Sequence, residues 1–182
     1  MPLLSLFLTT LLCGVLLVLL GIILLWRGPA VVLGLQQGLR SKPATVICFG
    51  LGTVWFLWHI SRLGEADFGQ YKGLLLAGFA SVGVLALFFT PDFLAVRGAA
   101  ILVLLTSWVG LEAAYMQWDY PGRLWLVGFI YCCVIIALYL GTVPYRLRDF
   151  LQWLAMARGR SQTLGGLLAI YGLLLCGVGL AY

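Results

Sequence analysis

Six long apolar runs, separated by short polar gaps, limit what this chain can fold into. A helix needs about 20 apolar residues to cross the hydrocarbon core of a bilayer, with a range of roughly 17 to 25. Backbone polar groups find no water in lipid, so only helices or closed barrels span a membrane, and continuous apolar runs favour helices. We therefore predict an all-α integral membrane protein, a bundle of six transmembrane helices over residues 3–26, 44–61, 73–89, 93–116, 124–143 and 163–181.

The composition agrees with a chain that folds in lipid. Hydrophobic residues make up 63% of the 182 residues and charged residues 9%, against roughly 25% charged in soluble domains. The gaps are too short to hold a soluble domain, so we expect residues 1–182 to form a single membrane domain. The first run has no charged side chain before it and exceeds the roughly 7 to 15 apolar residues of a signal peptide. We expect it to be retained.

Basic residues are concentrated in alternate gaps. The positive-inside rule places short loops rich in Lys and Arg in the cytoplasm. The richer side is therefore predicted to be cytoplasmic and both termini non-cytoplasmic. Arginine outnumbers lysine nine to two, which together with abundant Leu, Gly and Ala favours a bacterial cytoplasmic membrane. The eight basic residues on the richer side are Arg27, Arg40, Lys42, Arg97, Arg146, Arg148, Arg158 and Arg160, and the three on the other side are Arg62, Lys72 and Arg123.

Two stretches between the runs are predicted to be helices lying along the cytoplasmic interface, about residues 29–41 and 145–157. In the second, Pro144 should end the helix before it. Its apolar side chains recur at helical spacing, opposite a charged face, at Leu147, Phe150, Leu151 and Leu154. Such a helix suits contact with anionic headgroups or a docking partner. The residues predicted to make that contact are Arg146, Arg148, Trp153, Arg158 and Arg160.

Small residues at helical spacing predict where the helices pack. Helices in lipid associate through close van der Waals contact at Gly, Ala, Ser and Thr, because burial of apolar surface gives no drive there. We expect three such faces to meet protein rather than lipid, either within this chain or in another subunit. They are Gly14 and Gly21 in the first run, Gly73, Ala77 and Ser81 in the third, and Thr106, Gly110 and Ala114 in the fourth.

Two ionisable side chains near the ends of apolar runs are candidates for chemistry. A carboxylate inside a membrane is costly, so its presence there indicates a function. Glu112 could relay protons or coordinate a cation; alternatively it reaches water or pairs with Arg123. His59, the only histidine, ends the second run beside Trp55 and Trp58. It is a candidate contact for a cofactor such as a quinone headgroup, or simply a member of an aromatic belt at the interface.

Signatures of catalysis are absent from the sequence. It contains no HExxH, GxSxG or P-loop motif and no Cys/His spacing typical of a metal site. We therefore predict no enzymatic activity, no cofactor and no metal. We also predict no nucleic-acid partner, because the cytoplasmic gaps account for the net charge of +5. The prediction is a non-catalytic membrane subunit or accessory protein of a larger complex, with the bilayer and other membrane-protein subunits as partners. The alternatives are a small transporter or channel component and an intramembrane enzyme.

Overall fold

The computed structural model describes residues 5–39, 41–64, 67–89 and 93–182, and all regular elements within these residues are helical. Six helices are long and apolar enough to cross a membrane, in agreement with the predicted all-α fold: α1, α2, α3 with the short η2 before it, α4, α5 and α7. The elements are α1 Leu6–Gly38, α2 Lys42–Ser61, the 3₁₀ helix η2 Gly69–Tyr71, α3 Lys72–Phe89, α4 Leu94–Ala114, α5 Arg123–Thr142, α6 Tyr145–Ala155 and α7 Arg158–Leu180.

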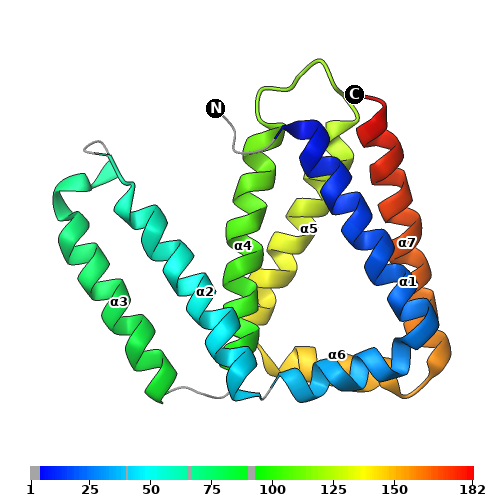
Figure 1. Ribbon diagram of the computed structural model, residues 1–182, viewed down its shortest axis with the longest axis horizontal. Helices are drawn as coiled ribbons and strands as arrows, with labels where there is room; N and C mark the ends of the chain where they lie inside the picture. Colours follow the sequence, from blue (N-terminus) through cyan, green and yellow to red (C-terminus); the bar gives the residue numbers. More distant parts are fainter. Residues whose placement is uncertain (1–4, 40, 65–66, 90–92) are drawn as a thin grey trace.

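The long helices are arranged as neighbouring pairs (Figure 1). The first and last, α1 and α7, make the most extensive contact, α4 packs on α5, and α2 joins the bundle through α4. Helix α3 packs chiefly on α2, at the edge of the molecule. The start of α1 and the end of α7 lie at the same end, whereas α6 lies crosswise at the opposite end.

Helix α1 is bent at Arg27, where the backbone leaves the helical region with φ −124° and ψ 26°. Pro29 follows within the helix. Proline lacks the N–H that the helix ladder needs, and its ring collides with the carbonyl four residues earlier, so it kinks a helix. The segment after the bend, residues 28–38 and here called distal α1, runs crosswise beside α6 (Figure 1). The expected spanning run and the expected interfacial helix are thus two arms of one bent helix.

Helix α6 packs its apolar face against distal α1. Val32 of distal α1 is 0% exposed, and Leu151 and Leu154 of α6 are 6% and 3% exposed in the same cluster. Phe150 stays 45% exposed. Pro144 separates this helix from α5, which ends at Thr142. The two crosswise segments therefore form a layer of their own, in which each covers part of the other's apolar surface.

The core of the bundle lies where α1, α4, α5 and α7 meet. Side chains from all four helices form one buried cluster, and Leu126 and Leu175 within it are fully buried. Helices α2 and α3 contribute nothing to this cluster. The molecule therefore has a compact four-helix part and a hairpin of α2 and α3 attached through α4.

Candidate functional site

The predicted packing glycines of α1 lie against α7. A Cβ added at Gly14 would lie 2.9 Å from the carbonyl oxygen of Gly172, and one added at Gly21 would lie 2.6 Å from that of Gly165. Glycine at these positions lets the two backbones approach closely, which is how small residues hold helices together in lipid. Gly28, seven residues further along α1, lies against the side chain of Ser161 in α7. This face of α1 is thus used within the chain.

The α7 half of this interface was not among the packing faces predicted from the sequence. Gly165 and Gly172 are seven residues apart, the same spacing as Gly14 and Gly21. The two ladders run antiparallel, so each glycine of one helix lies opposite a glycine of the other. The signal that could have found the pairing is this shared seven-residue spacing, which keeps small residues along one seam of each helix.

The predicted face of α4 is used only in part. A Cβ added at Gly110 would lie 2.6 Å from Cδ1 of Ile130 in α5, and Ala114 is 4% exposed. Thr106 remains exposed, and its hydroxyl donates to the carbonyls of Leu102 and Val103 in its own helix. The predicted face of α4 is therefore enclosed at Gly110 and Ala114 but not at Thr106.

The predicted face of α3 meets nothing in the described part of the chain. Gly73, Ala77 and Ser81 are all exposed, and a Cβ added at Gly73 would find no atom within 4 Å. The Ser81 hydroxyl donates to the carbonyl of Ala77 at 2.7 Å, so its polar group is already satisfied. Helix α3 instead packs on α2 through Gly83, which is its buried residue. The small-residue face, here called the α3 ladder, is left open.

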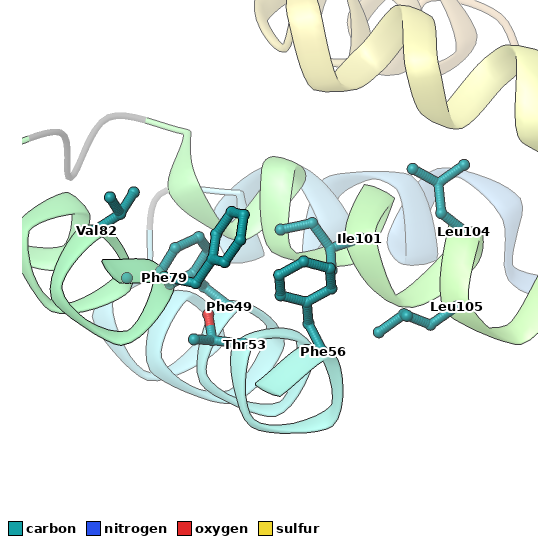
Figure 2. Close-up of a pocket in the computed structure, with 9 residues that line it drawn as sticks. Phe49, Thr53, Phe56, Phe79, Val82, Ile101, Leu104 and Leu105 are labelled. Atoms are coloured by element: carbon teal, nitrogen blue, oxygen red, sulfur yellow. The ribbon is translucent and has the colours of Figure 1, made fainter. Parts of the chain in front are cut away.

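An open apolar groove of about 430 Å³ lies between α2, α3 and α4 (Figure 2). Phe49 and Phe56 of α2, Phe79 of α3 and Ile101 of α4 line it, and Thr53 supplies a hydroxyl. Phe56 and Phe79 meet edge to face with their ring centroids 5.2 Å apart. Binding sites for polar ligands usually combine an apolar wall with several placed polar groups. The groove offers van der Waals contact rather than a site for polar recognition.

His59 lies among three tryptophans near the end of α2. Its ring meets Trp108 of α4 edge to face at 4.7 Å between centroids, and Trp58 at 5.3 Å. Trp55, one turn earlier, lies nearly parallel at 6.3 Å. The Nε2 atom is buried and has no hydrogen-bond partner among the described residues. The sequence identified two of these tryptophans, and Trp108 is added by the packing of α2 on α4.

Glu112 lies one turn beyond Trp108 on α4 and is half-buried. It does not pair with Arg123: the guanidinium donates from Nη1 to the carbonyl oxygen of Ala114 at 3.1 Å and lies 4.3 Å from the centroid of the Trp118 ring. The carboxylate forms no ion pair within the described residues. The described residues contain no group of three His, Cys, Asp or Glu side chains that could hold a metal ion.

The basic residues predicted at the interface fall into two groups. Arg160 is anchored to α6, because its Nη1 donates to the carbonyl of Trp153 at 2.9 Å and its guanidinium lies 4.6 Å from the centroid of that indole ring. Arg148 forms an ion pair with Asp149 at 3.0 Å. Arg146 and Arg158 are exposed. Arg40 lies outside the described residues.

These features place two kinds of surface on the molecule. The compact part holds its own helices together through matched glycines, whereas the hairpin of α2 and α3 carries an open ladder and an apolar groove. Comparison of the chain with protein-family models, with curated proteins and with solved structures finds no match.

Proposed function

We propose that this protein is a non-catalytic integral membrane subunit of a larger membrane complex, and that the α3 ladder is the face that attaches it. The observation that carries the proposal is the contrast between the small-residue faces. Gly14 and Gly21 of α1 are enclosed against Gly172 and Gly165 of α7, whereas the α3 ladder is exposed. Residues at i, i+4 and i+8 lie in one row along a helix, and a row of small residues is where helices in lipid approach each other closely. A partner helix would restore the close contact that such residues permit.

The proposed setting is a bacterial cytoplasmic membrane with both termini outside. Six long apolar helices support a multi-pass arrangement. The layer of distal α1 and α6 would lie at the cytoplasmic face, because Arg146 and Arg148 of α6 and Arg158 and Arg160 of α7 are at that end of the fold. The positive-inside rule supports this orientation.

The test compares two glycine substitutions on the same helix. Gly73 belongs to the α3 ladder, whereas Gly78 is also exposed, with no atom within 4 Å of an added Cβ, but lies about 140° around the helix from Gly73. Tagged wild type, Gly73→Leu and Gly78→Leu would be purified in a mild detergent from the organism that makes the protein. Native gels and mass spectrometry would then identify co-purifying chains.

We expect the wild type and Gly78→Leu to migrate in one large species with fixed partners. Gly73→Leu should lose them while the chain itself stays monodisperse, because a leucine side chain would hold a partner helix away from the ladder. A wild-type chain that purifies alone would refute the subunit role. If both variants retain the partners equally, the attachment face is not the α3 ladder.

A further inference from the structure

A small polar pocket lies in the layer formed by distal α1 and α6. Its volume is about 240 Å³, and it is open to the surroundings. The pocket is lined by Gln36 of α1, by Leu39 directly after it, by Arg148 and Gln152 of α6, and by Phe93, the residue just before α4. Three separate parts of the chain thus bring two carboxamides and a guanidinium to one place beside two apolar side chains.

Gln36 lacks the hydrogen bond that its environment calls for. Its Nε2 atom is buried and has no partner among the described residues. A buried donor without an acceptor costs about 1 to 3 kcal/mol, and such groups in folded proteins are generally satisfied by a bound water, ion or ligand. Rotation about the last torsion of the side chain, which is broad and shallow, would turn this donor toward an occupant of the pocket.

The guanidinium of Arg148 has N–H donors that its ion pair with Asp149 does not use. It binds Oδ1 of Asp149 through Nε at 3.2 Å and through Nη2 at 3.0 Å. A guanidinium has five N–H donors, so Nη1 and one proton on Nη2 remain for an occupant. The neighbouring carboxylate cancels much of the charge, and both side chains of the pair are about 40% exposed. Hydrogen bonding, rather than long-range attraction, would therefore hold the occupant.

We propose that this pocket binds the phosphoryl group of a phospholipid headgroup. Arg148, Gln36 and Gln152 all carry N–H donors, and the oxygens of a phosphodiester are acceptors that guanidinium and amide groups bind well. Leu39 and Phe93 provide an apolar wall for the glycerol and the first methylenes of the acyl chains. The inference rests on the membrane placement proposed above, where this layer lies at headgroup depth, and not on any partner subunit.

The experiment uses matched pairs of variants of the full chain. Gln36→Leu removes the unsatisfied donor, whereas Gln37→Leu makes the same change at the next, exposed residue. Arg148→Gln removes the pocket cation, whereas Arg62→Gln makes the same change at an exposed arginine just after α2, away from this layer. Purified, delipidated protein in detergent would be titrated with phosphatidylglycerol and, separately, with diacylglycerol of the same acyl chains, and bound lipid would be counted by native mass spectrometry.

We expect one phosphatidylglycerol to bind more tightly than diacylglycerol. Its affinity should fall about tenfold in Gln36→Leu and Arg148→Gln, the size expected for losing one hydrogen bond to a charged group, and should be unchanged in Gln37→Leu and Arg62→Gln. Glycerol 3-phosphate separates the two sources of a phosphoryl group. If a large excess of glycerol 3-phosphate fails to displace the lipid, the site takes a lipid headgroup. If it displaces the lipid, and its own binding falls in the same variants, the site still binds a phosphoryl group but takes it from a soluble ester.

Equal binding of phosphatidylglycerol and diacylglycerol would overturn the proposal, as would equal losses in each matched pair. A pocket filled by water alone gives this result. The outcome is separable from the subunit role, because Gly73→Leu, which is expected to lose its partners, should still bind the lipid with wild-type affinity.

Discussion

Gly21 of α1 is held against the backbone of α7. A Cβ there would lie 2.6 Å from the carbonyl oxygen of Gly165 and 2.7 Å from the amide nitrogen of Ala169. Backbone atoms cannot turn aside as the end of a flexible side chain can, so the helices would have to move apart. Even a single added methyl group is therefore expected to disrupt this pair.

Gly21→Ala should accordingly lower the free energy of unfolding by about 1 to 3 kcal/mol, the usual cost of overpacking. Gly34→Ala is the matched control on the same helix, because a Cβ there meets no atom within 4 Å. It should gain up to about 1 kcal/mol from the better helix propensity of alanine. Thermal unfolding of both variants in detergent measures the difference, and equal midpoints would contradict the proposed close contact.

At the scale of elements, the end of α6 is tied to the start of α7 by one side chain. Arg160 spans the turn between them, donating to the carbonyl of Trp153 and covering its ring. Arg160→Ala removes both contacts, whereas Arg158→Ala alters an exposed arginine two residues earlier. Amide exchange over residues 153–157 should be several-fold faster in the first variant and unchanged in the second. Equal exchange in both would mean that the tie contributes nothing to the order of the turn.

The positions of the elements could be predicted, but their neighbours could not. Apolar character is a local property, so the expected run 124–143 lies within one residue of α5, Arg123–Thr142, at each end. Pairing depends on which faces meet, and helices that are apolar all round give no polar side to mark the outside. Gly14 and Gly73 therefore looked equivalent in the sequence. The fold encloses Gly14 against α7 and leaves Gly73 exposed.

The candidate sites were predictable to different degrees. His59 could be placed near Trp55 and Trp58 because they lie on one helix, whereas Trp108 joins them through the packing of α4 on α2. The pocket at Gln36 had no sequence signal, because distal α1, α6 and the start of α4 are far apart in the chain. Local spacing cannot report on contacts that the bend in α1 creates.

At the scale of the whole molecule, the proposed orientation can be tested with single cysteines. The five native cysteines would first be replaced by alanine or serine. Asp119→Cys then places a thiol in the exposed α4–α5 connection, and Gly159→Cys places one in the exposed first turn of α7, at the other end of the fold. A membrane-impermeant maleimide should label the first thiol in intact cells and the second only after permeabilisation. The reverse labelling pattern would show that the protein has the opposite orientation in the membrane.

The pairing of α1 with α7 has a consequence for how the protein is made. Helix α1 leaves the ribosome before α2, α3, α4 and α5, yet its principal partner is α7, which follows them. During synthesis the seam of Gly14 and Gly21 would face lipid or the insertion machinery while the intervening helices are added. Contacts between distant parts of a chain form late, because a long loop must first close. The arrival of α7 would thus close this seam, and a chain stalled before it would present an unpaired glycine seam that quality control could recognise.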